Sequence, residues 1–523
     1  MSEITALLQR FEKVKTKRLE IESVLQSISD YVLVHKGDFN KTDSARVQTV
    51  NTYSNAAIEA NSRLASTIYG GLTNIGSKWF ALQLENAASP SIEVQRWLDQ
   101  VNNIMLHYFN SSESGFASQN HEFLLSVTSL GTACMWVDSS EEDGSIHFST
   151  IHLSEIFILE DNHGQIDTVF RKFKFTARQM AQMWGEEALS EKVTTVLKAA
   201  PDTEFELLHV VKPKGKGASS KLKAFKYESI YIDIANKHQL SVKGFYEMPY
   251  IVARFSKRTQ ETYGRSPAWD CLPTIKLVNQ MEKEVLRAKQ LRNMPPLLVA
   301  DDGVMSPLKV APNAIIMGGL SYDGSQRIAP LNIGGDPQGV DNDIARYTQA
   351  IRESFFVDQL YFKDGTPVTA TEAVQRQEAR LQMLTPAISR LTTEYLNKLI
   401  EVVFDTLYRR GDLPPIPQEL DPNKINIEYL SPLAKLQKFQ DIQALQRAVS
   451  VLAPLAQVDP TMFDVLNLSG SMRYAALAAG VPANLLRSEE EVAQMKAAKE
   501  QQAAIQQNLQ LSAYANQLNK PVQ

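Results

Sequence analysis

Cysteine is scarce in this sequence of 523 residues. The two that occur, Cys134 and Cys271, lie far apart, and neither belongs to a CxxC pair. This spacing indicates neither a disulfide framework nor a cysteine-based zinc site. We therefore expect the protein to fold in a reducing compartment.

Long apolar runs are also missing. No stretch approaches the roughly 18 consecutive apolar residues that can cross a membrane. The N-terminal segment, MSEITALLQRFEKVKTKRLE, carries charge from its third residue onward. We expect no signal peptide, no membrane anchor and no membrane partner.

An excess of positive charge is absent as well. Lys and Arg number 54 against 59 Asp and Glu, so the formal net charge is −5 and the pI is near 6.0. A protein that holds nucleic acid by displacing counterions usually carries a basic excess. Any DNA contact must therefore be local and weak. With 44% hydrophobic residues, the chain can bury a substantial core in more than one packing unit.

Motifs for catalysis and metal binding are lacking too. Lys214-Gly215-Lys216-Gly217 lacks the preceding glycine and the following Ser or Thr of a phosphate loop. His121-Glu122 is not followed by the second histidine of a zincin helix, and the acidic run 139–143 lacks the alternating ligands of a calcium loop. We predict no catalytic residue, no metal site and no cofactor.

The first quarter of the sequence has the periodicity of helices. Apolar residues recur at intervals of three and four through residues 1–34, which predicts an amphipathic helix. A second helix is expected over 45–75, and a third over 91–109, directly after Pro90.

The residue pattern changes from helical to strand-like between Thr132 and Val252. Short runs rich in β-branched and aromatic residues, such as ACMWVD, EIFILED and VFRKFKFT, are separated by turn formers. We predict an antiparallel β region with one helix inserted near 176–198, and hence an α+β fold that is mainly α. The basic run from Lys212 to Lys226 is predicted to be a solvated hairpin loop rather than a nucleic-acid contact.

Two helices are predicted to flank a small β insert. The first begins at Ser266-Pro267, is irregular at Pro273, and ends before Pro295. Strand-like runs follow over 297–333. Asp336 and Pro337 then provide the N-cap and first position of the second helix, whose apolar stripe is Val340, Ile344, Tyr347, Ile351 and Phe355.

A longer helix follows the loop DQLYFKDGTPV. This helix is predicted to begin with Thr369-Ala370-Thr371-Glu372, which matches the sequence motif of a capping box. It is also predicted to kink at Pro386. Residues 412–422 read as a stiff linker, and the remainder reads as helical, with an Ala/Gln/Glu-rich final helix from Ser488.

Two segments of the sequence resemble a known protein family. The block GRSPAWDCLPTIKLVNQMEKEVLRAKQLRNMPPLLVADDG is similar to the first stem helix and clip entry of podovirus-type portal proteins, the head-to-tail connectors of short-tailed bacteriophages. The block YFKDGTPVTATEAVQRQEARLQMLTPAISRLTTEYLNKLIEVVFDTLYRRGDLPP is similar to that family's tunnel loop and long helix. The order of the other predicted elements fits the same family over nearly the whole chain.

The resemblance implies a domain organisation for the chain. The implied parts are the wing (1–266), the first stem helix (267–294), the clip (295–335), the second stem helix (336–358), the tunnel loop (359–369), the long kinked helix returning to the wing (370–431), and the helical crown (432–523).

The resemblance also implies a function. Members form dodecameric rings at one capsid vertex, conduct double-stranded DNA, dock the large terminase subunit and later join the tail. Implied partners also include capsid and scaffold proteins, a tail adaptor and internal core proteins, first in the host cytoplasm and then in the virion. About twelve stem helices spaced about 10 Å apart would leave a bore of about 28 Å, which admits a DNA duplex.

Two other classes of protein are alternatives to a portal protein. A packaging ATPase or nuclease is disfavoured because no phosphate loop is present. A tail adaptor or an internal core protein could share the acidic balance and the Ala/Gln-rich C-terminal helix, but it would need no paired stem around a β insert.

Six basic residues are candidates for contact with DNA in such a channel. Lys363 is the sharpest, because the family's loop at this place projects into the lumen; its alternative is an ordinary solvated turn on Asp364-Gly365. The other candidates are Arg287, Lys289 and Arg292, which could instead complement a helix dipole, and Arg346 and Arg352, which could instead pair with Asp343 and Glu353.

Overall fold

The computed structural model describes a defined set of residues. They are 3–33, 52–74, 78–84, 92–139, 144–215, 224–293, 297–299, 322–326, 328–330, 337–357, 383–417 and 425–429, with a few single positions. The chain divides into two compact units. Unit 1 comprises Met1–Gly70 and Ser112–Asp405, and unit 2 comprises Gly71–Ser111 and Thr406–Gln523.

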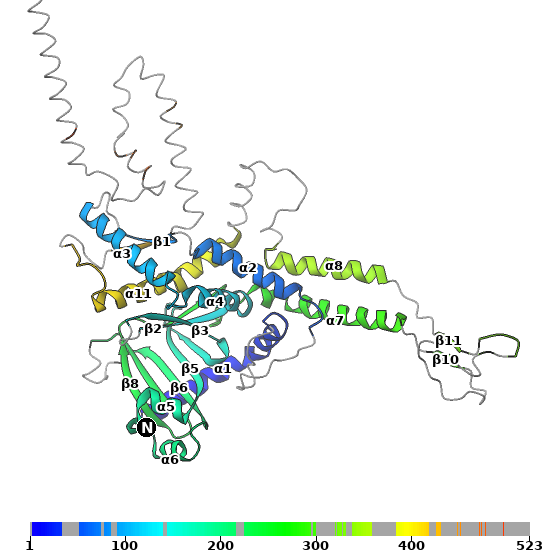
Figure 1. Ribbon diagram of the computed structural model, residues 1–523, viewed down its shortest axis with the longest axis horizontal. Coiled ribbons are helices and arrows are strands. Elements are labelled where there is room, and N and C mark those ends of the chain that lie inside the picture. The colour runs from blue at the N-terminus through cyan, green and yellow to red at the C-terminus, as the bar shows by residue number, and fades with distance from the viewer. Residues whose placement is uncertain are drawn as a thin grey trace, which may run out of the picture. The chain divides into compact units, whose positions relative to one another are not determined.

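A five-stranded antiparallel sheet organises unit 1 (Figure 1). Its strands, in spatial order, are β4 (Ile156–Glu160), β5 (Ile166–Thr176), β6 (Glu204–Pro213), β7 (Tyr227–Asp233) and β8 (His238–Phe245). Side chains alternate between the two faces of a strand. On β6, Leu208 and Val210 accordingly pack against helix α1 (Glu3–Tyr31), whereas Leu207 packs in the cluster on the other face, with α5 and α6. The predicted β region and α+β class are confirmed.

Helix α1 is fixed to this sheet by apolar packing and by one buried cation. Leu7, Phe11 and Val14 lie in the core. Arg18 is 1% exposed; it donates to the carbonyl of Ile156 at 2.6 Å and lies over the ring of Phe157 at 4.3 Å. Burial lowers the pKa of Arg18, while nearby Tyr263 and Glu22 favour its charged form. The predicted amphipathic helix therefore packs over one face of the sheet.

A second, three-stranded sheet has the order β3 (Ile146–Ile151), β2 (Thr132–Ser139) and β9 (Tyr250–Arg254). Helix α4 (Phe116–Leu130) packs against it and ends at Gly131, where φ is +81°. A Cβ added at Gly131 would lie 2.4 Å from the carbonyl oxygen of Gly264. Only glycine allows both this backbone conformation and the close approach of the segment that leads into α7.

Two short helices connect β5 to β6 where one had been predicted. They are α5 (Ala177–Trp184) and α6 (Glu191–Ala199). Gly185, with φ of +79°, ends α5, and Ser190 caps α6 by accepting from the backbone N–H of Val193. The single helix predicted near 176–198 is wrong because these local stop and start signals divide it.

His209 joins the two sheets at their centre. It is buried, its Nδ1 lies 2.6 Å from Tyr250 Oη, and its Nε2 lies 2.8 Å from Ser229 Oγ. Its ring stacks on Tyr231 at 3.8 Å. Burial, followed by the charge of Arg171, holds the pKa of His209 well below its ordinary value.

This environment predicts an acid-sensitive fold. The unfolded chain binds a proton at His209 below about pH 6.5, whereas the folded chain does not, so stability is present above that pH and falls as the pH drops below it. We expect the loss to reach about 1.4 kcal/mol per pH unit. Urea unfolding from pH 7.5 to 5 should show this slope in the natural chain and a shallower one in His209→Gln; parallel slopes would contradict the assignment.

Two long antiparallel helices extend side by side from unit 1 (Figure 1): α7 (Pro267–Asn293) and α8 (Pro337–Ser354). Their predicted starts are confirmed. Pro273 lies inside α7, whose helical assignment continues through it, so the predicted irregularity does not interrupt the helix. Between them, β10 (Leu297–Val299) pairs antiparallel with β11 (Ile328–Pro330), as predicted for a β insert.

The long helix after α8 is described from residue 383 onward. It is α-helical through Pro386 to Leu391, forms a π-helical turn over Thr392–Leu396, and continues as α11 (Asn397–Arg410). The π-helical departure from α-helical geometry comes at 392–396, and the kink at Pro386 stays a prediction. The predicted capping box at 369–372 and the predicted C-terminal helix from 488 lie outside the described residues.

Helix α2 (Ala56–Leu72) begins later than the predicted residue 45, because 52–55 are not helical. Unit 2 contains α3 (Ile92–Asn110), as predicted, and an antiparallel pair of β1 (Phe80–Leu84) and β12 (Ile425–Tyr429). Rings of Trp79, Phe80 and Phe109 form its aromatic core. None of the helices described is long and apolar enough to span a membrane.

Candidate functional site

The α7–α8 pair is buried at its base and exposed farther out. Its base is buried through Ile275 and Val278 on α7, through Ile351 on α8 and through Phe355 directly after α8. Beyond the base, no residue is buried in the described stretches 280–293 of α7 and 339–350 of α8. Lys283 lies over the ring of Tyr53 at 5.8 Å, but the rest of these stretches presents helical surface that the described chain does not bury.

Five of the six candidate DNA contacts lie on this pair. Arg287, Lys289 and Arg292 are exposed on α7; Arg346 is exposed and Arg352 is half-buried on α8. Lys289 forms an ion pair with Asp341 across the two helices at 3.7 Å, and Arg346 pairs with Asp343 at 3.3 Å. Lys363 lies outside the described residues.

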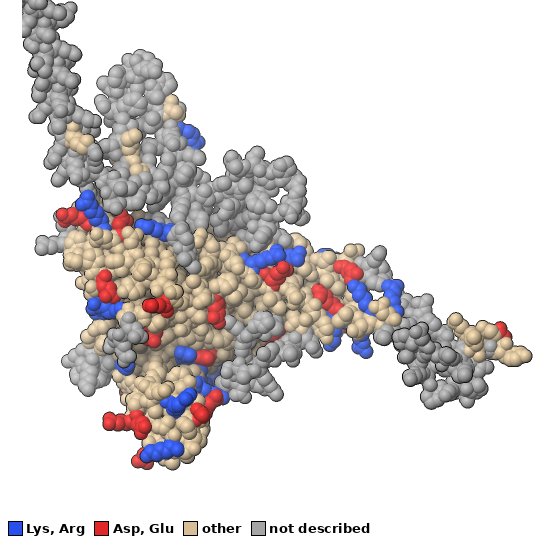
Figure 2. Space-filling view, in the orientation of Figure 1, with Lys and Arg blue, Asp and Glu red and all other residues tan. Residues whose placement is uncertain are grey.

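The charge on the exposed stretches is nearly balanced. Residues 280–293 carry four cations and two carboxylates, and residues 339–357 carry two cations and three carboxylates. Figure 2 shows blue and red side chains interspersed along the two helices. A surface of this kind attracts phosphates weakly, because few phosphates can be neutralised at once.

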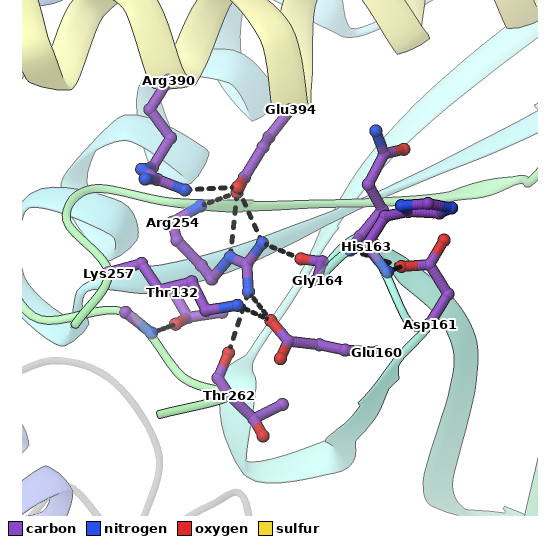
Figure 3. A network of polar contacts seen from close by, with 12 residues as sticks. Thr132, Glu160, Asp161, His163, Gly164, Arg254, Lys257, Thr262, Arg390 and Glu394 are labelled. Atoms are coloured by element: carbon purple, nitrogen blue, oxygen red, sulfur yellow. Dashed lines mark hydrogen bonds and ion pairs between the residues drawn. The ribbon is translucent and has the colours of Figure 1, made fainter. Parts of the chain in front are cut away.

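A buried ionic cluster surrounds Arg254 (Figure 3). Arg254, at the end of β9, has a side chain only 2% exposed. Its Nη2 donates to Glu394 Oε1 at 2.7 Å and its Nε donates to Oε2 at 3.1 Å, while its Nη1 contacts Glu160. It also donates to the carbonyls of Gly164 and Thr262.

The ion pairs outweigh the cost of burial at Arg254. Burial alone would lower its pKa, but hydrogen bonds and charges of Glu394 and Glu160 raise it above the ordinary value. Lys257 adds a second cation to Glu160, and Arg390 donates to Glu394 at 2.8 Å. The cluster ties β9, the β4–β5 turn and the long helix together.

The π-helical turn places neighbouring side chains on different partners. Glu394 points to Arg254, whereas Tyr395 donates to Asn120 Oδ1 at 2.8 Å and stacks on Phe123 at 4.0 Å. Single π turns often occur where side chains must be aimed in this way. The long helix is thereby held to both β9 and α4.

A further polar contact fixes the middle of α7. Asn279 is 8% exposed, and its Oδ1 accepts from the backbone N–H groups of Tyr53 at 2.7 Å and Ser54 at 3.3 Å. Sequence reasoning missed Asn279, Arg254 and Glu394. Asn279 bonds to Tyr53, 226 residues away, and Arg254 bonds to Glu394, 140 residues away, so no local sequence pattern indicates these contacts.

Metal-binding clusters and thiols were considered as possible reactive groups in the described part of the chain. No group of three or more His, Cys, Asp or Glu residues there could hold a metal ion. Burial raises the pKa of the Cys134 thiol, and it raises that of Cys271 to about 12, so both thiols stay protonated and unreactive near neutral pH.

Comparison with known proteins gives a consistent result. The family described as "Bacteriophage head to tail connecting protein" matches residues 5–486. A "Probable portal protein" of Bordetella phage BPP-1 is 27% identical over 532 aligned positions, which cover 98% of this chain and 93% of that protein. A "Portal protein" of Salmonella phage epsilon15 is 26% identical over 534 positions, which cover 98% of this chain and 94% of that protein.

Proposed function

We propose, from the premise that this chain belongs to the bacteriophage head to tail connecting proteins, that it assembles into the ring through which viral DNA enters and leaves the capsid. The family and both relatives make the chain a portal protein of a short-tailed phage and a structural component of the virion. The finer features, which are the dodecamer, the DNA channel and the individual partners, are our proposal.

The observation that carries the proposal is the α7–α8 pair. Two long helices that leave the body with no cover over their outer halves are suited to line a pore when copies stand side by side. About twelve such helices spaced about 10 Å apart would surround a bore of about 28 Å. The nearly balanced charge of the pair supports conduction, because a duplex held by many phosphates would move slowly.

The parts of the subunit are assigned on the same basis. We assign residues 1–266 to the wing, α7 and α8 to the stem, 295–335 to the clip, 359–369 to the tunnel loop, 370–431 to the long helix and 432–523 to the crown. Lys363, Arg287, Lys289, Arg292, Arg346 and Arg352 remain the candidates for contact with DNA. The clip is the proposed docking surface for the large terminase subunit and later the tail adaptor.

Other partners follow from a position at the capsid vertex. We propose contact with the major capsid and scaffold proteins during assembly in the host cytoplasm, and with internal core proteins in the mature virion. No catalytic role is proposed, and ATP hydrolysis is assigned to the terminase.

Electron microscopy of the purified protein tests the proposal directly. We expect ring-shaped end views with about twelve-fold symmetry and an axial hole near 28 Å. A closed oligomer with no hole, or a protein that stays monomeric when scaffold and capsid proteins are added, would refute a channel-forming ring.

A further inference from the structure

The outer halves of α7 and α8 need a neighbour. A helix pair that buries no side chain over residues 280–293 and 339–350 gains little from tertiary packing, which normally supplies most helical stability. The positions of the charged residues on these stretches indicate which neighbour packs against them.

The ion pair between Lys289 and Asp341 sets the register of the two helices. Because α7 and α8 run antiparallel with the same rise of about 1.5 Å per residue, a step back along α7 matches a step forward along α8. Residue 287 therefore lies at the same height as residue 343, and residue 284 lies at the same height as residue 346.

Helical periodicity places these four residues away from the partner helix. Successive residues turn by about 100°, so a residue two or five positions from one that faces the partner points to the opposite side. Arg287 and Glu284 stand in this relation to Lys289, and Asp343 and Arg346 stand in it to Asp341.

The side chains are available for a new contact. Arg287 and Glu284 are exposed, and the side chains of Asp343 and Arg346 are 52% and 69% exposed. Their present partners are close along the helix: Arg346 pairs with Asp343 at 3.3 Å, and Glu284 accepts from Gln280 at 2.6 Å. Exposed pairs of this kind contribute little and exchange partners readily.

We propose that α8 of one copy packs beside α7 of the next copy in the same register, so that Asp343 meets Arg287 and Arg346 meets Glu284. This inference rests on the ring assembly proposed above. A rotation axis parallel to the helices keeps every residue at its height, and at both heights the two charges are opposite. The face that one copy offers is thus complementary to the other face of the same chain, which is the requirement of a ring.

We call this contact, Arg287 and Glu284 of one copy against Asp343 and Arg346 of the next, the seam. It changes the list of residues that can contact DNA in the channel. Arg287 and Arg346 are engaged between copies and do not face DNA. Lys289 is engaged with Asp341 inside the subunit, so that Arg292 and Arg352 are the two of the five candidates on the pair that remain for contact with DNA.

Charge reversal tests the seam. Arg287→Asp and Asp343→Arg each place like charges opposite one another at every interface of the ring. We expect each to raise the subunit concentration needed for half-assembly by about tenfold, with partial recovery at high salt. The combined variant, Arg287→Asp with Asp343→Arg, restores opposite charges and should assemble nearly as well as the natural chain. Mass photometry measures the ring fraction.

A matched control is Lys198→Asp on α6, an exposed cation whose reversal changes the net charge equally. It should leave assembly unchanged. If the single reversals assemble normally, or if the combined variant is no better than either, the seam is refuted while rings of the natural chain still support the proposed function. If the natural chain forms no rings, the proposed function itself fails.

A second measurement covers the case in which a reversal prevents folding. Arg287→Cys combined with Asp343→Cys should give a ladder of disulfide-linked oligomers after mild oxidation, because the two natural cysteines are buried. Each single cysteine variant should give no ladder beyond a dimer. A combined variant that forms rings yet gives only monomers on a non-reducing gel would overturn the proposed contact.

Discussion

Replacing Arg254 with alanine is expected to lower the free energy of unfolding of unit 1 by about 3–5 kcal/mol. The change leaves Glu394 and Glu160 with their carboxylates in a partly buried site, and it removes donors from the carbonyls of Gly164 and Thr262. Breaking one side of a buried ion pair costs far more than the pair contributes when intact, because the remaining charge stays desolvated. Urea unfolding followed by circular dichroism measures the loss.

Two further variants separate the buried pair from general effects of removing arginine. Arg258→Ala, four residues along, removes a surface ion pair with Asp270 at 3.5 Å whose side chains are 59% and 61% exposed, so it should cost less than about 1 kcal/mol. Arg254→Lys keeps the charge but loses the two-pronged contact with Glu394, and should fall between them. Equal losses for Arg254→Ala and Arg258→Ala would show that the cluster does not brace unit 1.

Local signals in the sequence were sufficient for the two projecting helices. Ser266-Pro267 and Asp336-Pro337 combine a capping residue with a proline at the first helical position, and both signals act within a few residues. The strands were also predictable, because runs such as VFRKFKFT are rich in β-branched and aromatic residues and are bounded by turn formers. The proposed function rests on these elements.

Helix α4 gave no comparable signal. Its sequence, FASQNHEFLLSVTSL, is buried on nearly all sides, so it has no polar face to mark the period of a helix. Its hydroxyl side chains are accommodated by bonding back into the helix: Ser126, Thr128 and Ser129 donate to carbonyls four residues earlier. Burial in unit 1, rather than amphipathic patterning, makes this segment helical.

The π-helical turn and the ionic cluster could not be predicted for a related reason. Nothing in TTEYL departs from an ordinary helical sequence, and YIVAR reads as a strand whose last residue is solvated. Within the turn, Glu394 and Tyr395 bond to Arg254 and Asn120, which come from segments 140 and 275 residues away. A local sequence pattern contains no information about contacts of this range.

Replacing residues 297–333 with a short linker is expected to abolish binding of the large terminase subunit to the ring. The insert joins the outer ends of α7 and α8, and its described hairpin projects apolar side chains: Leu320 is 66% exposed and Tyr322 is fully exposed. The turn that leads from Tyr322 to Gln326 is held by local hydrogen bonds. Asp323 Oδ1 accepts from the backbone N–H of Ser325 at 3.1 Å and from its hydroxyl at 2.7 Å, and Gly324 takes a φ of +80°.

A single substitution tests the same surface without changing the chain length. Aromatic side chains presented on an ordered turn are typical energetic centres of protein interfaces, and removing one commonly costs about 2 kcal/mol or more. Tyr322→Ala should therefore weaken terminase binding about thirtyfold in a surface plasmon resonance titration on assembled rings. Tyr408→Ala, which removes an exposed tyrosine on α11, should have no effect. If rings of both Tyr322→Ala and the linker variant bind terminase as the natural ring does, the docking surface lies elsewhere, and the insert serves the ring or the tail instead.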